Sequence, residues 1–414
     1  MSRALSRAGA VAALLAVAAV LAGCVGAPMP VPTPTATPTP TGDGILRIGT
    51  LFPVTGPTAF LGSGLTAGVN AAIREINEAG GVLGAPVEVV NRDAGDPATD
   101  KAELSFDDLV AQGVDVVIGP SSSAVAQRLL PRAAAAAVPL VSPAATFPQL
   151  STAADGEWFF RTIPSYADQG AVLARLLTDA DAGSVALVRT GDELGSSISD
   201  TLTASLAEHD GELVADVVAD TDPAAVVAEL DDADPDAVVL ATADNGEATR
   251  ALITALVAAG YGGGKLWLTS QNLADYSQSL PAGTLTDVNG IVEGLIPDAD
   301  LQARIAREDP GLASFSYSAE AYDATVLAAL AATLARDDGG ASIARMLRAA
   351  SIDGIKCTSY GECLDVLKTR DDIDYDGVTG SLNLDEDGDL TTPGFSRYSY
   401  TAENKPTFAE WVTL

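Results

Sequence analysis

Two short apolar runs joined by a helical stretch constrain the fold of this chain most strongly. Residues 114–118 and 139–141 are almost wholly apolar, as expected of strands that are buried on both faces of a sheet. Residues 124–136, between them, have the composition of a helix. A strand, a helix and a second strand in this order, with short links, predict two parallel strands covered by the helix.

Small polar residues follow each of these strands. Ser121, Ser122 and Ser123 stand where the helix begins, and residues 142–146 (Ser-Pro-Ala-Ala-Thr) follow the second strand. The first N–H groups of a helix can be capped by serine, and they can also hold an anion. Ligands of open α/β sheets bind off the carboxyl ends of the strands, so the two loops form a candidate binding site. Helix capping without a ligand is the alternative interpretation.

The start of the chain has the layout of an export signal. Arg3 and Arg7 precede an apolar run, residues 8–22, which is shorter than the ~20 residues that span a bilayer comfortably. The run ends in Leu-Ala-Gly-Cys24, which resembles the lipobox of bacterial lipoproteins, whose cysteine is lipidated and becomes the new N-terminus. We therefore expect a signal at residues 1–24, lipidation of Cys24 and a location on the outer face of the cell membrane. An uncleaved anchor is the alternative.

Alternating strand and helix signals divide the rest of the chain into two units. Residues 25–44, rich in proline and threonine, are expected to form an extended tether. The pattern starts at Ile45, pauses over residues 147–165 and restarts at Val185. Because a body of about 370 residues exceeds what one core usually serves, we expect two domains. The closing third is expected to have no sheet of its own, and residues 356–363 are expected to form a loop.

The pattern also predicts the individual elements. The expected strands are residues 45–52, 86–91, 114–118, 139–141, 185–189, 212–218, 237–241, 265–269, 290–297, 378–384 and 395–400. The expected helices are residues 65–79, 99–112, 124–136, 198–209, 223–230, 247–259, 318–334 and 343–350.

Signals for enzymatic or cofactor chemistry are weak. Gly62, Gly64 and Ala67 match a dinucleotide fingerprint, but a long loop separates them from the preceding strand, where the first glycine should lie close to the strand end. The only histidine, His209, stands on a polar helix end, so no His-based catalytic or metal site can be assembled. Residues 372–377 match the opening of a calcium loop without its closing glutamate, so calcium stays open and acidic turns are favoured. We expect no enzyme, no cofactor and no metal site.

Cysteine usage and charge agree with an exported chain that binds a small molecule. Cys357 and Cys363 remain once Cys24 is lipidated, and in an oxidising compartment two such close cysteines are expected to form a disulfide. The chain has 23 basic and 56 acidic residues, a formal net charge of −33. Nucleic acid and anionic membrane surfaces are therefore disfavoured as partners.

Several short motifs occur together in a fixed order. They are residues 49–57, 75–81, 93–97, 118–123, 142–146, 160–162 with 168–170, and Tyr322 with Asp323. From residue 45 to about residue 400, this set resembles the periplasmic leucine/isoleucine/valine-binding family of transporter receptors. The resemblance implies an α/β, type I periplasmic-binding-protein fold with two doubly wound parallel-sheet lobes, three crossover segments and a ligand in the cleft. It places the first lobe at 45–163 and 291–378, the second at 164–290 and 379–414, and crossovers near 163–165, 290–292 and 378–381.

The resemblance also implies a function. It indicates a lipid-anchored extracytoplasmic solute-binding receptor of an ABC importer, which binds a small amino acid, branched-chain or similar, and presents it to a membrane permease. The receptor is expected to be a monomer. A sensory receptor of the same fold, and a receptor for an amide or another neutral metabolite, are the alternatives.

The family's ligand positions can be carried onto this sequence. Ser123 and Thr146 correspond to the positions that hold the ligand's α-carboxylate and α-ammonium, with backbone groups of Ser121 and Ala144 sharing the work. The other candidates for the first lobe are Ser122, Ala145 and Tyr322.

Three positions depart from the family. Leu61 and Leu194 stand where the family has tyrosines, and Gln271 stands where it has the glutamate that binds the ammonium. An amide is a weak replacement for that acid. The nearby acids that are candidates to replace it are Asp192, Glu193 and Asp244. Because Phe60 and Leu61 make the first lobe's lip apolar, we expect a small, mainly apolar ligand with a carboxylate or amide.

Overall fold

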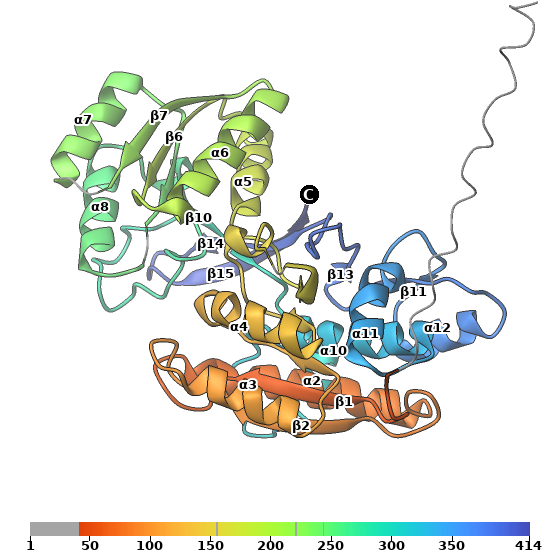
Figure 1. Ribbon diagram of the computed structural model, residues 1–414. Coiled ribbons are helices and arrows are strands. Elements are labelled where there is room, and N and C mark those ends of the chain that lie inside the picture. Colours follow the sequence, from red (N-terminus) through yellow and green to blue (C-terminus); the bar gives the residue numbers. More distant parts are fainter. Residues whose placement is uncertain (1–40, 155, 220–221, 243) are drawn as a thin grey trace, which may run out of the picture. The chain divides into compact units, whose positions relative to one another are not determined.

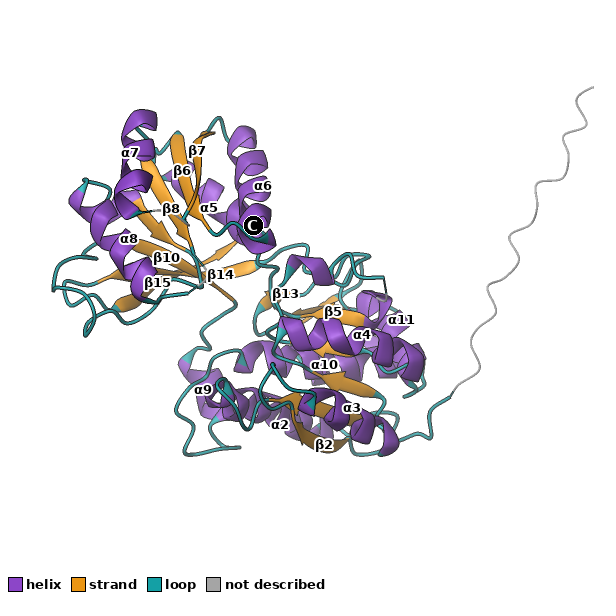
Figure 2. Ribbon diagram, turned by 60° about the vertical axis from the view of Figure 1, so that its left-hand side comes forward, coloured by secondary structure: helices purple, strands orange, loops and turns teal. Residues whose placement is uncertain are grey.

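The computed structural model describes residues 41–414, except residues 155, 220, 221 and 243. The predicted signal, Cys24 and most of the tether lie outside the described residues. Two sheets, each covered by helices on both faces, form two lobes (Figures 1 and 2). The prediction of an α/β fold with two doubly wound lobes is therefore confirmed.

The first lobe is built on a five-stranded parallel sheet with the strand order β2-β1-β3-β4-β5. Its strands are β1 (Arg47–Phe52), β2 (Glu88–Asp93), β3 (Val116–Ile118), β4 (Leu140–Ser142) and β5 (Phe159–Arg161). Helices α2 (Gly62–Glu78) and α10 (Ser318–Ala335) cover one face, and α3 (Lys101–Ala111) and α4 (Ser123–Ala136) cover the other. Ile48 of β1 packs under α2 and α10, whereas Leu51 packs under α3 and α4. Because both faces of the sheet are buried, every residue of β3 and β4 is apolar except Ser142, the last residue of β4.

Helix α2 comes close to α10 and to the segment before it at glycines. A Cβ on Gly68 would lie 2.1 Å from the carbonyl oxygen of Ser318, and a Cβ on Gly64 would lie 2.8 Å from that of Ser314. Helix α2 begins at Gly62 rather than at the predicted Leu65, so it contains the glycines that match a dinucleotide fingerprint. Gly62 and Gly64 allow α2 to pack closely against the backbone at Pro53 and Ser314, a role that needs no nucleotide.

The closing third of the chain adds further elements to the first lobe. They are α9 (Ala299–Ile305), α11 (Gly340–Leu347), α12 (Tyr360–Leu367), β11 (Lys356–Cys357), β12 (Asp374–Gly377) and β13 (Gly380–Ser381). The last three form a small sheet of their own, so the prediction of no separate sheet was wrong, as was the predicted loop over 356–363. The pairing of Lys356 with Asp374 joins distant segments and leaves no local pattern. Helix α12, by contrast, carries a signal that we missed, because Ser359 caps it by accepting from the N–H of Glu362.

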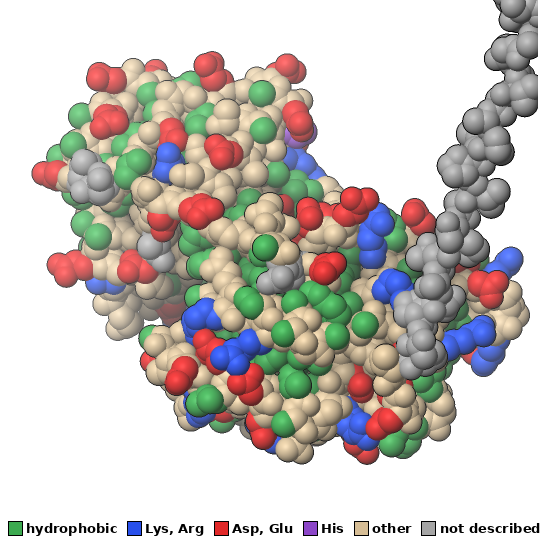
Figure 3. Space-filling view, in the orientation of Figure 1, with side chains coloured by type: hydrophobic (Ala, Val, Ile, Leu, Met, Phe, Trp, Pro, Cys, Tyr) green, Lys and Arg blue, Asp and Glu red, His purple; other side chains and the backbone are tan. Residues whose placement is uncertain are grey.

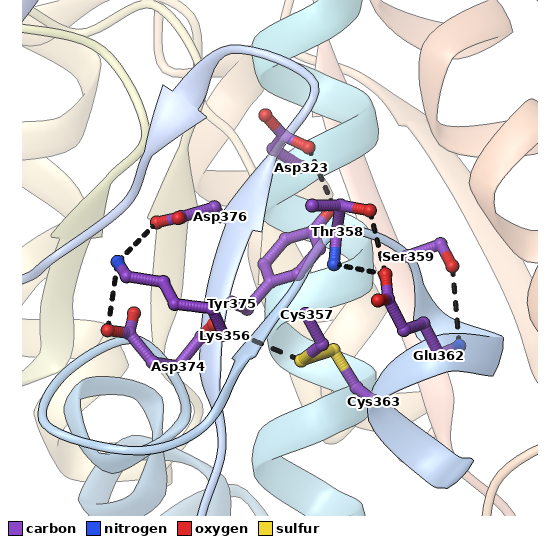
Figure 4. Close-up of a disulfide and its surroundings, with 10 residues drawn as sticks. All are labelled: Asp323, Lys356, Cys357, Thr358, Ser359, Glu362, Cys363, Asp374, Tyr375 and Asp376. Atoms are coloured by element: carbon purple, nitrogen blue, oxygen red, sulfur yellow. Dashed lines mark hydrogen bonds and ion pairs between the residues drawn. A yellow bond between two sulfur atoms is a disulfide. The ribbon is translucent and has the colours of Figure 1, made fainter. Parts of the chain in front are cut away.

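A disulfide between Cys357 and Cys363 joins β11 to α12, as predicted (Figure 4). Beside it, the Lys356 ammonium lies 2.9 Å from Asp374 and 2.8 Å from Asp376 (Figure 4). These two carboxylates belong to the calcium-loop match, and a cation of the chain itself lies between them. Among the residues that the structure describes, no group of three His, Cys, Asp or Glu side chains is arranged to hold a metal ion.

The second lobe has a seven-stranded sheet with the strand order β15-β14-β10-β9-β8-β6-β7. Its strands are β6 (Ser184–Arg189), β7 (Glu212–Val218), β8 (Ala237–Ala241), β9 (Leu266–Leu268), β10 (Asn289–Glu293), β14 (Gly394–Tyr400) and β15 (Pro406–Thr413). The β14 and β15 strands are antiparallel to their neighbours, and the others pair in parallel. Helices α5 (Asp168–Asp179) and α6 (Glu193–Glu208) cover one face, and α7 (Pro223–Ala233) and α8 (Glu247–Ala258) cover the other.

Three segments connect the lobes: residues 162–167, 294–298 and 391–393. The first agrees with the predicted crossover at 163–165. Residues 290–292, expected to be the second crossover, lie within β10, where Ile291 pairs with Arg397 of β14. After β13, Leu382 and Leu384 still pack in the core of the first lobe, so the second lobe resumes at β14 instead of at residue 379.

The surface reflects the acidic composition of the chain. Acidic side chains are spread over the face of both lobes shown in Figure 3. The single histidine, His209, is exposed at the end of α6, in agreement with its interpretation as a surface residue. No helix among the described residues is long and apolar enough to cross a membrane.

Candidate functional site

The loops after β3 and β4 lie side by side at the carboxyl edge of the first lobe's sheet, because these two parallel strands are neighbours. Ser123, the first residue of α4, joins the loops: its Oγ accepts from the N–H of Thr146 at 2.9 Å and from that of Phe147 at 3.1 Å. Ser122 is the N-cap of α4 and accepts from the N–H of Val125. The Ser142 hydroxyl donates to the carbonyl of Pro120 at 2.7 Å and accepts from Ala145 at 2.9 Å. The structure therefore brings the predicted first-lobe loops together.

Two hydroxyl groups of these loops retain hydrogen-bonding capacity. Two N–H donors occupy the acceptor positions of Ser123 Oγ, so its own O–H is left to donate. Among the described residues, neither this O–H nor the Thr146 hydroxyl has a hydrogen-bond partner. Ser123 is 8% exposed, and Ser121, Ala144 and Thr146 are half-buried. With the N-terminus of α4 behind them, these groups suit a carboxylate.

A buried arginine holds the loop after β4. Arg161, at the end of β5, is 0% exposed and donates to the carbonyls of Ala145 and Phe147 at 3.4 and 3.1 Å. Its Nε lies 2.6 Å from Oδ1 of Asp389, and Ser151 hydrogen-bonds to both side chains. The sequence motif at residues 160–162 therefore positions the loop. The sequence did not indicate that Asp389 is the partner of Arg161, because Asp389 lies 228 residues further along the chain.

An apolar lip lies beside these loops, between β1 and α2. Val54 and Phe60 are 65% and 67% exposed, whereas Leu61 is half-buried against the first lobe's core. Asp93 holds this segment: it accepts from the N–H of Val54 at 2.8 Å and pairs with Lys101. Burial alone would raise the pKa of Asp93, but these donors, with Thr55 and Gly95, hold it well below its usual range.

The second lobe presents two of its candidates on the loops after β8 and β9, where Gln271 and Asp244 are exposed. Leu194 lies in the first turn of α6, half-buried against the core of the second lobe. The fully buried Asn272 fixes both loops, since its Nδ2 donates to the carbonyls of Thr242 and Asp244 at 3.0 and 2.6 Å. The side chain of Gln271 is thus exposed on a rigid loop at the carboxyl edge of the second sheet.

Tyr322 lies elsewhere in the first lobe. It is 3% exposed, and its hydroxyl donates to Oε2 of Glu75 on α2 at 2.6 Å. The Arg304 guanidinium of α9 lies 5.2 Å from the centre of its ring. The structure therefore places Tyr322 among the helices, in contact with α2 and α9, instead of in the loops that hold Ser123 and Thr146. Its neighbour Asp323 accepts from the Tyr375 hydroxyl (Figure 4). Asp323 also accepts from the N–H of Thr379, and so fixes the small sheet.

Sequence and structure comparisons agree on the family. A family profile described as "Periplasmic binding protein" matches residues 45–363. The "Chemotactic signal transduction system substrate-binding protein BasB" of Halobacterium salinarum is 28% identical over 361 residues, which cover 82% of this chain and 83% of BasB. The "Leu/Ile/Val-binding protein homolog 1" of Brucella melitensis is 33% identical over 166 residues, 39% of this chain and 43% of its own length.

Solved structures show the same fold. The branched-chain amino acid transporter substrate-binding protein LivJ from Streptococcus pneumoniae, in complex with isoleucine, has a TM-score of 0.61 at 22% identity, over 89% of this chain and 99% of LivJ. A solute-binding protein of an ABC transporter from R. palustris, in complex with benzoate, has a TM-score of 0.59 at 19% identity, over 89% and 96% of the two chains. The chain belongs to the periplasmic binding protein family, and its predicted relation to the leucine/isoleucine/valine-binding proteins is confirmed.

Proposed function

We propose that this substrate-binding protein is a lipid-anchored extracytoplasmic receptor that binds a small amino acid, branched-chain or similar, for an ABC importer. The observation that carries the proposal is the geometry at Ser123. Its Oγ accepts hydrogen bonds from the second loop, and its own O–H remains free to donate. The Thr146 hydroxyl, which also has no partner among the described residues, belongs to that second loop. An α-carboxylate would take both hydroxyl donors and the N-terminus of α4.

The proposed mechanism follows from this geometry. The ligand's carboxylate binds the first-lobe loops, and the apolar lip of Val54 and Phe60 covers an aliphatic side chain. Contacts with the second lobe then favour the closed form, because a ligand shifts a conformational equilibrium by its differential affinity for the two forms. A membrane permease recognises the closed, liganded receptor, which acts as a monomer and needs no cofactor.

The test is a calorimetric titration with leucine and isoleucine, after a thermal-shift screen of amino acids, amides and small acids. Removing a charge-assisted hydrogen bond costs about 1.5–3 kcal/mol, so Thr146→Ala should weaken binding roughly ten- to a hundredfold. Thr152→Ala, at an exposed threonine of the same lobe, is the matched control and should leave Kd unchanged. An unchanged Kd in Thr146→Ala would mean that the ligand binds elsewhere.

The proposed anchor has a test of its own. Cys24→Ser should move the protein from washed membranes to the soluble fraction, because the remaining apolar run is too short to anchor well. Retention of the variant in the membrane fraction would contradict lipidation at this residue.

A sensory receptor is the second candidate. The match to BasB covers 82% of this chain, whereas the match to the Brucella melitensis relative covers 39%. In this case the liganded form would address a signalling partner instead of a permease. Deletion of the gene separates the two functions: loss of radiolabelled leucine uptake supports import, and loss of a behavioural response to leucine with intact uptake supports sensing.

A further inference from the structure

If the ligand carries an ammonium group, the second lobe needs an acid. Of the three nearby candidates, Glu193 is exposed to solvent in the first turn of α6, and the other two are engaged in their own turns. Gln271 is neutral. Asp192 caps α6, where its Oδ1 accepts from the N–H of Gly195 at 3.0 Å and from the Thr190 hydroxyl at 2.5 Å. Asp244 accepts from the N–H of Gly246 at 2.8 Å. Both carboxylates thus stabilise their own turns.

Glu293 is another acid at the same edge of the second lobe's sheet, and the site described above does not use it. It is the last residue of β10, which neighbours β9, and the loop after β9 carries Ser270 and Gln271. The Ser270 hydroxyl donates to Oε1 of Glu293 at 2.9 Å. Gln169, at the start of α5, donates to the same oxygen at 2.7 Å and accepts from the N–H of Ser270 at 2.9 Å. Glu293 is therefore bonded to the residue next to Gln271.

The charge of Glu293 is not compensated within the protein. The side chain is 4% exposed, and both donors bind one oxygen, Oε1. Over residues 41–414, apart from the four positions that are not described, no Lys or Arg pairs with it and no donor binds Oε2. Burial raises its pKa to about 7, and the Asp168 carboxylate adds to the effect. A buried carboxyl group without a counter-charge is costly to ionise, and a ligand cation would remove that cost.

We propose that Glu293, held in place by Gln169 and Ser270, receives the amino group of the ligand and so selects ligands with an ammonium over their deaminated analogues. The inference rests on the proposed function and names the ligand class of that site. Ser270 and Gln169 act as positioning residues, since they fix Oε1 and leave Oε2 for the ligand. The position of Gln271 then needs no acid.

The experiment compares leucine with its deaminated 2-keto analogue by calorimetry on the full folded chain. Wild type should bind leucine more tightly than the keto acid. Glu293→Gln should weaken leucine binding at least tenfold and leave the keto acid's Kd unchanged or lower. Asp115→Asn is the matched control: Asp115 is a partly buried acid whose pKa burial raises to about 7, and it lies at the amino end of β3, where it accepts from Arg47. It should leave both values unchanged.

The remaining outcomes are decisive. An unchanged leucine Kd in Glu293→Gln overturns the assignment of Glu293 and leaves the proposed function standing. An equal loss for leucine and the keto acid shows a purely structural role and also overturns it. If wild type binds neither compound, the proposed ligand class fails, and the assignment fails with it. If circular dichroism shows that Glu293→Gln does not fold, Glu293→Asp takes its place, because it keeps the charge on a shorter side chain. Glu293→Asp should weaken the binding of leucine and not that of the keto acid; a leucine Kd equal to that of wild type would refute the assignment.

Discussion

Replacing Asp389 with alanine should strongly destabilise the first lobe. The carboxylate is the counter-charge of Arg161, which is 0% exposed, and the two side chains make paired bonds of 2.6 and 2.7 Å. Without Asp389, the guanidinium stays buried with Ser151 and two backbone carbonyls as its partners. A carbonyl dipole does not replace a full negative charge.

The magnitude follows from the burial of the pair. Breaking a buried ion pair by removing one partner costs about 3–5 kcal/mol. For a cooperative unit of some 150–250 residues, each kcal/mol lowers Tm by about 2–4 °C. Asp389→Ala should therefore lower Tm by roughly 6–20 °C. Because net stabilities are about 5–15 kcal/mol, the variant should still fold at room temperature.

The assay is thermal and urea unfolding of wild type, Asp389→Ala, Arg161→Met and the double variant Arg161→Met/Asp389→Leu. The double variant removes both charges and should recover a large part of the loss, because a buried pair can be replaced by apolar residues at little cost. A fall in Tm of less than ~2 °C for Asp389→Ala would refute the reasoning. So would a double variant that is as unstable as the sum of the two single ones.

Two further predictions concern the disulfide and pH. Reduction of Cys357–Cys363 should cost about 2 kcal/mol in the chain-entropy model, and alkylation followed by mass spectrometry should find both thiols blocked before reductant is added. Burial raises the pKa of Glu320 to about 8, so the stability that its protonated form contributes is complete below its ordinary pKa and is lost as pH rises towards 8. The free energy of unfolding should fall between about pH 5 and 8, by at most about 1.4 kcal/mol per pH unit for this proton. Tm should fall with it, and the fall should be shallower in Glu320→Gln than in wild type; the same pH dependence of Tm in both proteins would contradict the raised pKa of Glu320.

Much of the fold could be predicted because its signals are local. The β3–α4–β4 unit follows from two apolar runs, a serine cap and a helical stretch, and its observed bounds differ by at most two residues from those predicted. The edge strand β15 has mostly exposed residues and no apolar run, so it was missed. Helix α5 has an amphipathic pattern, with Val172, Leu173 and Leu177 buried, that we overlooked in the stretch before the pattern restarts at Val185.

The first-lobe loops could also be predicted, for a topological reason. Neighbouring parallel strands end at the same edge of a sheet, so the residues after β3 and β4 must meet. Sequence alone did not show that Ser123 would bond to Thr146 and Phe147. That contact depends on how the second loop turns, and Arg161 fixes this turn from β5.

The roles of Arg161 and Glu293 were missed because their partners are distant in the sequence. Each of the two residues nevertheless leaves a signal in the sequence. Arg161 follows two phenylalanines, and Glu293 ends the apolar run of β10. A charged residue at the end of a strand buried on both faces must find a partner, a ligand or a shifted pKa, since burial without one is too costly. Arg161 has found a partner, Asp389, 228 residues away. Glu293 has only neutral donors within the described chain and a raised pKa, which is the state expected of an acid that awaits a ligand's positive charge.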